Sequence, residues 1–378
     1  MSARTTRRVA ASGVLLATAL LGSLLVPATP AVAATRVPGT PVAPLAQVNQ
    51  SRNGGDNASR GLVRATKVLG TPDAGVVPKI GLVGAVADDG AYVAYESRVD
   101  TRTVDLMISS PALAGAVPVR VFLPPSWKTA PTRTFPSLYL LPGASEKADY
   151  QAWSLYSSVK TTTARAEALI VMPSVGSTGI GSNWTGAGRG YQYDTFLATE
   201  LPQLLQRGYR ASARAAVAGI STGGLTALTL ATQHPGRYAA VASYSGLLNP
   251  SLPVVSQLVQ GLLIREGLNP FALWGDPLLF GFFTWQARDP ANSTGNLRAS
   301  KVIVSSGNSF PGSLDPAGTG VSTFEATTLS TSQTLVLRAR LSGVAVTTDF
   351  YGSGTHSWPY WSREFDRTAP ALLAALTG

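Results

Sequence analysis

Continuous apolar runs mark the strands of this chain of 378 residues. A strand covered by helices on both faces is apolar at every position, whereas a half-exposed strand alternates. Five such runs lie between residues 137 and 305, and an amphipathic helix is predicted at 195–206. Including two strands before these runs and one after them, the expected strands are 104–109, 117–123, 137–141, 168–173, 215–220, 239–245, 301–305 and 344–351.

Strands that alternate with helices predict a mostly parallel central sheet with helices on both faces. The length allows one large α/β domain with additional segments. We expect this domain to span 101–378, with regular structure beginning near Thr101 and an insertion at 250–298. The insertion is strongly apolar, which fits either additional core or a cap that lines an acyl-chain groove.

The first 33 residues have the pattern of a secretory signal peptide. Three arginines precede an apolar run at 9–26, and Ala31-Val32-Ala33 is a small-x-small cleavage site. An uncleaved membrane anchor is the alternative, because the run approaches spanning length. Residues 34–100 lack sustained periodicity, and we interpret them as a linker or N-terminal arm of unknown role. A leader of this kind predicts a protein that is secreted to the extracellular space or the cell envelope.

Composition excludes several kinds of chemistry. The chain has no cysteine and two histidines, which argues against thiolate and His-rich metal sites. We therefore expect no metal and no cofactor. The formal net charge of +10 is spread along the chain, and no basic stripe with interleaved aromatics indicates nucleic acid. A preference for anionic surface polymers or lipids of the cell envelope is compatible with this charge.

A candidate nucleophile lies where the run 215–220 meets a helix-forming segment. Gly219-x-Ser221-x-Gly223 is the nucleophile-elbow pattern, in which a serine occupies a sharp turn between strand and helix. The residues two before and two after the serine must be small, because strand and helix approach closely there. The pentapeptide alone is a weak signal, but the strand before it and the helix after it strengthen the prediction.

The serine needs a base, and the chain offers two histidines. His234 lies 13 residues beyond Ser221 on the same predicted helix, about 20 Å away at 1.5 Å per residue. We interpret it as a surface residue at the helix end. His356 remains, in the Gly-rich loop 352–357 after the last predicted strand.

The acid of a triad should fall between the serine and the histidine in the chain. Asp315 and Glu325 both follow the strand 301–305 and are the leading candidates, whereas Asp289 precedes it. Spacing alone does not decide between Asp315 and Glu325. For the oxyanion hole, two backbone N–H groups are expected, from Thr222 after the nucleophile and from Ala144 after the strand 137–141.

Several motifs resemble the mycolyltransferase (antigen 85) family of secreted actinobacterial acyltransferases. The most specific is 354–361, Gly-Thr-His-Ser-Trp-Pro-Tyr-Trp. The others are Tyr139-Leu140-Leu141-x-Gly143, the segment 194–202, Ser245-Gly246-Leu247-Leu248-Asn249-Pro250, and Trp274-Gly275 with Asp289-Pro290. The similarity extends from about Val104 to the C-terminus.

The resemblance implies an α/β-hydrolase fold with a Ser-Glu-His triad. The family's glutamate follows a phenylalanine about thirty residues before the histidine, which matches Phe324-Glu325 and favours Glu325 over Asp315. The family's oxyanion positions match Ala144 and Thr222. Its sugar-site tryptophan matches Trp358, and we add Gly143 and Trp274 as substrate-binding candidates.

The chain departs from the family next to the predicted oxyanion hole. Family members that use trehalose carry Asp-Gly-Leu-Arg where this chain has Pro142-Gly143-Ala144-Ser145, so two polar groups of the acceptor site are missing. We expect a secreted serine acyltransferase that moves an acyl group from an ester or glycolipid to a sugar or lipid hydroxyl. The alternatives are a carboxylesterase that uses water and an envelope-binding protein with an idle site. The oligomeric state stays open.

Overall fold

The computed structural model describes residues 85–187 and 190–378. The predicted signal peptide and most of the predicted arm lie outside these residues. Among the described residues, nine strands form one sheet in the order β1-β2-β3-β5-β4-β6-β7-β8-β9. The strands are β1 (Tyr92–Arg98), β2 (Thr103–Ser110), β3 (Gly115–Phe122), β4 (Phe135–Leu141), β5 (Leu169–Pro173), β6 (Ala211–Ile220), β7 (Tyr238–Tyr244), β8 (Lys301–Ser306) and β9 (Val346–Phe350).

The sheet is parallel from β5 to β9 and antiparallel at its other edge. β1, β2, β3 and β5 pair antiparallel in that order, and the remaining neighbours pair parallel. All eight expected strands are confirmed, with ends that shift by a few residues. The expected start of regular structure near Thr101 is wrong, because β1 precedes it. This edge strand is only half-buried and carries Glu96 and Arg98, so its pattern lacks a continuous apolar run.

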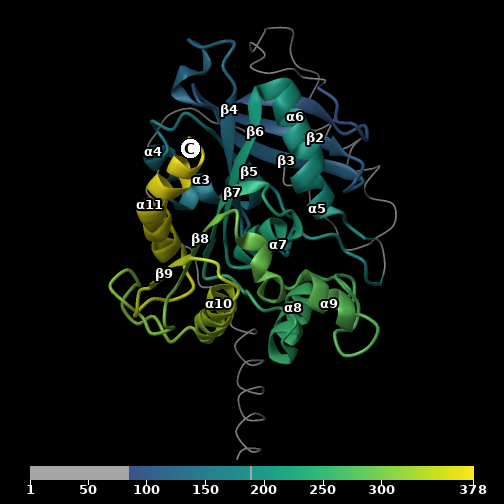
Figure 1. Ribbon diagram of the computed structural model, residues 1–378, viewed down its shortest axis with the longest axis vertical. Helices are drawn as coiled ribbons and strands as arrows, with labels where there is room; N and C mark the ends of the chain where they lie inside the picture. Colours follow the sequence, from purple (N-terminus) through teal and green to yellow (C-terminus); the bar gives the residue numbers. More distant parts are fainter. Residues whose placement is uncertain (1–84, 188–189) are drawn as a thin grey trace, which may run out of the picture. The chain divides into compact units, whose positions relative to one another are not determined.

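Helices cover both faces of the sheet (Figure 1). On one face, α6 and α7 pack over the central strands, and α10 packs near β8. On the other face, α3, α4 and α11 bury a second cluster that contains Trp153, Trp361 and Phe365. The helices are α3 (Ala152–Tyr156), α4 (Val159–Thr162), α5 (Tyr193–Thr195), α6 (Leu201–Tyr209), α7 (Thr222–Gln233), α8 (Pro253–Arg265), α9 (Phe282–Arg288), α10 (Thr323–Leu341) and α11 (Trp358–Ala375).

Shorter turns connect these elements. Between α5 and α6, residues Phe196–Glu200 form a π-helical turn, so the single helix predicted at 195–206 changes its winding. The change occurs next to Pro202, which has no N–H to donate to the preceding turn. The 3-10 turns are Pro125–Trp127, Asp149–Gln151, Pro290–Asn292 and Thr294–Leu297. Among the described residues, no helix combines the length and apolarity needed to cross a bilayer.

The apolar insertion is partly core and partly exposed to solvent. One face of α8 is core, with Val259 and Leu263 fully buried. The segment that joins α8 to α9, and the first turn of α9, instead expose large apolar side chains to solvent. The carboxyl ends of the parallel strands, where α/β sheets bind ligands, carry the loops that hold the predicted site residues.

Candidate active site

Ser221 occupies a strained turn between β6 and α7. Its φ is 52° and its ψ is −124°, a region that non-glycine residues adopt at a cost. The turn is held because the N–H of Ser221 donates to the carbonyl of Tyr244 at 2.9 Å. A Cβ on Gly219 would lie 2.2 Å from the carbonyl oxygen of Gly223. Small residues are therefore required on both sides of Ser221, for the reason that the sequence pattern indicated.

His356 meets Ser221 across 135 positions of sequence. Its Nε2 lies 2.9 Å from the Oγ of Ser221. The imidazole stands nearly perpendicular to the rings of Phe324 and Trp361, with centroids 4.7 and 4.8 Å away. These two contacts restrict the rotation of the ring. A neutral imidazole at this distance can accept the hydroxyl proton.

Glu325 lies behind His356 and is fully buried. Its Oε2 is 2.7 Å from the Nδ1 of His356. Its Oε1 accepts hydrogen bonds from Ser245 Oγ at 2.7 Å, Ser306 Oγ at 3.0 Å and Gly307 N–H at 2.6 Å. Burial alone would raise the pKa of Glu325, but His356 and the donors Ser245 and Gly307 lower it below its ordinary value. The carboxylate is thus held ionised and fixed in orientation.

The other acids considered from sequence have different partners. Asp315 accepts hydrogen bonds from Thr355 Oγ1 and, at 2.7 Å, from Tyr360 OH. It fixes the loop next to His356 and does not touch the imidazole. Asp289 is buried and accepts from the backbone of Ser251 at 3.0 Å, so it holds the start of the insertion.

His234 lies at the other end of α7, as the helix spacing predicted. Its Nε2 is 2.8 Å from the Oδ1 of Asp194, and its side chain is about one-third exposed. This histidine therefore belongs to a separate, half-buried pair.

The loop after β4 faces the nucleophile. A Cβ on Gly143 would lie 3.1 Å from the Cβ of Ser221, so this loop passes close to the serine. Gly179, at φ +64°, backs the loop, and a Cβ there would lie 2.5 Å from Thr222 Oγ1. Among the described residues, the backbone N–H groups of Ala144 and Thr222 donate to no protein acceptor. Both groups are thus free to bind a ligand oxygen.

Trp358 is joined to the continuation of this loop through Glu146. The Nε1 of Trp358 donates to Glu146 Oε1 at 3.1 Å, and the tryptophan ring lies 5.6 Å from that of Tyr156. Burial raises the pKa of Glu146 to about 7. Sequence analysis predicted Trp358 but missed Glu146. Its place three residues beyond Gly143 was the only available signal.

A second polar group joins the same loop to the insertion. The Oγ of Ser145 hydrogen-bonds both Arg265 and Glu266 at the end of α8. Sequence analysis missed both residues, because they lie 120 positions away in a segment predicted from its apolar content. The end of α8 therefore reaches the loop that carries Ala144.

Trp274 has a different environment from Trp358. It is buried against Trp285, with ring centroids 4.9 Å apart. Its Nε1 donates to Ser182 Oγ at 3.2 Å. These contacts with Trp285 and Ser182 are those of a core residue that supports the insertion. Across the described part of the chain, no group of three or more His, Asp or Glu side chains could hold a metal ion.

Comparisons with known proteins point to one family. A family model described as "Putative esterase" matches residues 110–372. Diacylglycerol acyltransferase/mycolyltransferase Ag85A of Mycobacterium tuberculosis (strain ATCC 25618 / H37Rv) is 30% identical over 327 residues, covering 82% of this chain and 91% of the relative. Ag85C of Mycobacterium leprae (strain TN) is 29% identical over 317 residues, covering 79% and 89%.

Solved structures agree in fold. The crystal structure of Mycobacterium tuberculosis MPT51 (FbpC1) matches with a TM-score of 0.62 and 25% identity, over 75% of this chain and 99% of the other. An S-formylglutathione hydrolase from Agrobacterium tumefaciens shares the fold, with a TM-score of 0.57 and 15% identity over 75% and 99%. The expected α/β-hydrolase architecture is therefore confirmed.

Proposed function

We propose a reaction for this enzyme, which belongs to the esterase family and, within it, to the mycolyltransferase (antigen 85) group: Ser221 takes an acyl group from an ester donor and passes it to an alcohol. The observation that carries this proposal is the continuous hydrogen-bonded chain from Glu325 through His356 to Ser221, with distances of 2.7 and 2.9 Å. This arrangement is what nucleophilic acyl transfer requires.

In the first half-reaction, Ser221 Oγ attacks the carbonyl carbon of the donor ester while His356 Nε2 accepts the hydroxyl proton. The negative oxygen of the tetrahedral intermediate is held by the N–H groups of Ala144 and Thr222. His356 then gives the proton to the leaving alcohol oxygen as the C–O bond breaks. Glu325 stabilises the imidazolium formed in between, and an acyl ester remains on Ser221.

In the second half-reaction, an acceptor hydroxyl loses its proton to His356 and attacks the acyl ester. The group formed by Trp358, Tyr156 and Glu146 supports a polyhydroxy acceptor such as a sugar, because aromatic rings cover its apolar face and a carboxyl group accepts hydrogen bonds from its hydroxyls. We propose a glycolipid or other lipid ester as the acyl donor. Lipid esters fit the relatives' name, diacylglycerol acyltransferase/mycolyltransferase. Secretion to the cell envelope rests on the signal-peptide pattern of residues 1–33.

Hydrolysis is the second candidate, and one observation favours it. Arg265 and Glu266 bind Ser145 and are engaged with one another, so fewer polar groups are free to hold an acceptor in place of water. The catalytically idle binding protein is disfavoured by the unbroken chain of hydrogen bonds at Ser221.

The test is to incubate the protein with a long-chain acyl ester, with and without glycerol or trehalose, and to identify products by mass spectrometry. Transfer predicts a new acyl ester of the added alcohol. Free acid as the sole product would reject transfer and leave hydrolysis. Ser221→Ala is the control, and equal product formation by this variant would reject both reactions.

A further inference from the structure

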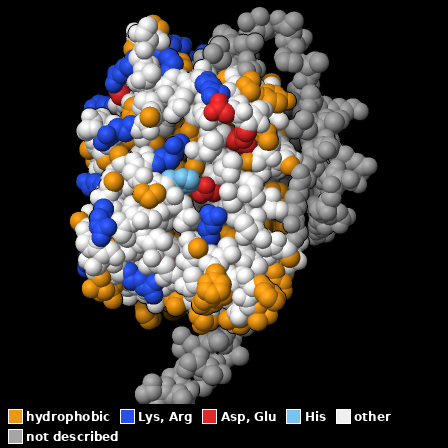
Figure 2. All heavy atoms as spheres, turned by 45° about the vertical axis from the view of Figure 1, so that its right-hand side comes forward, with side chains coloured by type: hydrophobic (Ala, Val, Ile, Leu, Met, Phe, Trp, Pro, Cys, Tyr) orange, Lys and Arg blue, Asp and Glu red, His pale blue; other side chains and the backbone are white. Residues whose placement is uncertain are grey.

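The insertion carries an exposed apolar surface just before α9 and in its first turn. We name this surface the insertion tip: Leu278, Leu279, Phe280, Phe282 and Phe283. The exposed fractions of these side chains are 68%, 63%, 99%, 44% and 80% in that order. In Figure 1 the α8–α9 region lies at the lower right, and Figure 2 shows apolar side chains gathered at this end of the molecule. Soluble proteins rarely expose a contiguous group of this kind unless it binds something.

Hydrogen bonds within the turn fix the conformation of the insertion tip. The carboxylate of Asp276 accepts from the N–H of Leu278 at 2.9 Å, and its carbonyl accepts from Gly281 N–H at 2.9 Å. A Cβ on Gly281 would lie 2.4 Å from the carbonyl oxygen of Trp274, so the turn is tightly packed from below. Trp285 anchors the base, since its Nε1 donates to Gly275 O at 3.0 Å. The exposure of the apolar side chains is therefore part of an ordered turn.

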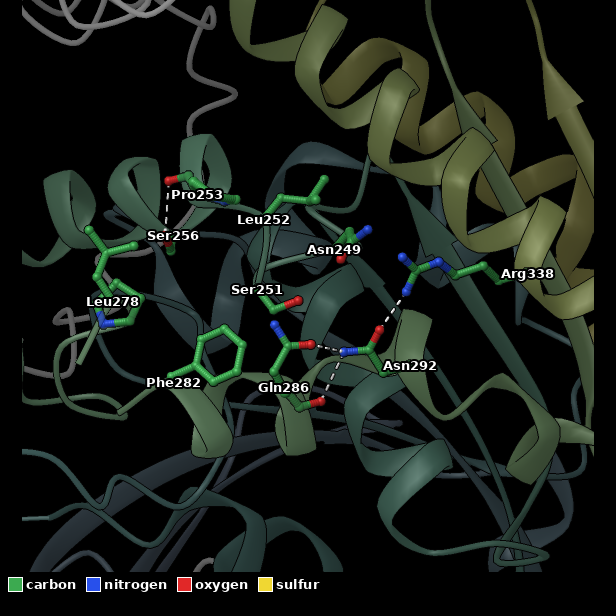
Figure 3. Close-up of a pocket in the computed structure, with 11 residues that line it drawn as sticks. Asn249, Ser251, Leu252, Pro253, Ser256, Leu278, Phe282, Gln286, Asn292 and Arg338 are labelled. Carbon is green, nitrogen blue, oxygen red and sulfur yellow. Dashed lines mark hydrogen bonds between the residues drawn. The ribbon is translucent and has the colours of Figure 1, made fainter. Parts of the chain in front are cut away.

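A pocket of about 220 Å³, with both apolar and polar side chains in its wall, lies directly beside the insertion tip. Leu278 and Phe282 form part of its wall, and Asn249 and Arg338 form another part (Figure 3). Asn249 is 1% exposed, yet neither its Oδ1 nor its Nδ2 has a hydrogen-bond partner. Buried amide groups are almost always paired, so this side chain lacks a donor and an acceptor that a ligand would supply.

Two charged groups bear on this pocket. Among the described residues that line it, Arg338 alone is charged. Behind the wall, buried Asp289 accepts a hydrogen bond from Ser251 Oγ at 2.6 Å, and the charge of Arg338 opposes the rise in the pKa of Asp289 that burial causes. The Nη1 of Arg338 donates to Asn292 and, at 3.4 Å, to the carbonyl of Ala291, so both partners are neutral. A cationic group with a free amide suits a headgroup that carries a negative charge and hydroxyls. The adjoining apolar side chains suit the hydrocarbon of the same molecule.

We propose that the insertion tip and this cavity together dock the enzyme on an anionic lipid surface. The tip enters the acyl region, and the cavity takes the phosphate and glycerol of one lipid headgroup. Phenylalanine and leucine side chains favour this interfacial position. The docking surface goes beyond acyl transfer at Ser221, because neither Asn249 nor Arg338 belongs to the catalytic chain of hydrogen bonds.

The test is flotation of the processed chain with phosphatidylglycerol vesicles and with phosphatidylcholine vesicles. Wild type is expected to bind, with preference for phosphatidylglycerol. The double variant Phe280→Ser with Phe283→Ser should bind at least tenfold more weakly to both. Arg338→Gln should lose the preference for phosphatidylglycerol. Val99→Ser, which alters an exposed apolar residue outside the insertion, should bind as wild type does.

Other outcomes overturn the proposal. The proposal is overturned if the wild-type protein does not float with the vesicles. It is also overturned if the double variant floats as well as wild type does. Tight binding of soluble glycerol phosphate with no binding to vesicles would overturn it too, because the cavity would then be a site for a small molecule. Self-association abolished by the double variant, without vesicle binding, would indicate a protein interface. Vesicle binding by Ser221→Ala should equal that of wild type, which separates this test from the proposed reaction.

Discussion

The substitution Glu325→Gln tests how the buried carboxylate controls His356. Glutamine has nearly the same shape, so the site stays filled. Three donors converge on one oxygen, from Ser245, Ser306 and Gly307 at 2.7, 3.0 and 2.6 Å. The glutamine side chain has a single acceptor oxygen, which must therefore occupy this position. Its NH2 group is then directed at the Nδ1 of His356.

This reversal changes the tautomer of the imidazole. Nδ1 becomes the acceptor for the amide N–H, and the ring proton moves to Nε2. Nε2 then donates toward Ser221 and no longer accepts the hydroxyl proton. A wrong tautomer of this kind lowers kcat by about 10⁴-fold in serine hydrolases. At 1.36 kcal/mol per factor of ten, the barrier rises by about 5.5 kcal/mol.

The assay is kcat for hydrolysis of a p-nitrophenyl ester near pH 7.5. Circular dichroism and thermal unfolding would verify that Glu325→Gln is folded, and Ser221→Ala gives the background rate. If Glu325→Gln keeps kcat within tenfold of wild type, Glu325 does not set the tautomer of His356, and the proposed arrangement is refuted.

Three further substitutions probe the loops around the site. Asp315→Asn should lower kcat by less than about tenfold, which is roughly the contribution of one hydrogen bond. A loss as large as that of Glu325→Gln in the same assay would contradict the assignment of Glu325, and not Asp315, as the acid of the triad. Gly179→Ala should lower kcat about 100-fold or more by displacing Thr222, whereas Gly318→Ala, at φ +82° in open space, should leave kcat unchanged; equal effects would argue against a precise oxyanion loop. Because burial raises the pKa of Glu146 to about 7, the stability that its protonated form contributes is complete below about pH 4.5 and lost as pH rises through 7. Glu146→Gln should therefore gain stability over wild type between pH 5 and 8, by about 1 kcal/mol after allowance for partial exposure, and a difference in Tm that does not change with pH would contradict this.

The parallel strands could be predicted because burial on both faces leaves an unmistakable apolar run. β1 was missed because an edge strand needs an apolar residue at only some of its positions, and Glu96 and Arg98 interrupt it. The apolar content of the insertion likewise left the burial of its side chains undecided. An apolar sequence at 250–298 does not tell which side chains face the core and which, like Phe280, face solvent.

The candidate site was predictable where residue types are scarce. With two histidines in the chain and one of them tied to the helix of Ser221, His356 remained by elimination. Glu325 could not be separated from Asp315 by spacing alone, since both lie between β8 and His356 in the sequence. Burial and the 2.7 Å contact distinguish them. Glu146 and Arg265 depend on how distant loops meet, which no local pattern encodes.

The central claim is that Ser221, activated by His356, carries the acyl group. The most direct measurement is intact and peptide mass spectrometry of the enzyme quenched within the first turnover of an acyl ester. The account predicts one acyl adduct, located on Ser221, and none on the variants Ser221→Ala or His356→Ala. An adduct on another residue, or turnover by Ser221→Ala at the wild-type rate, would contradict it.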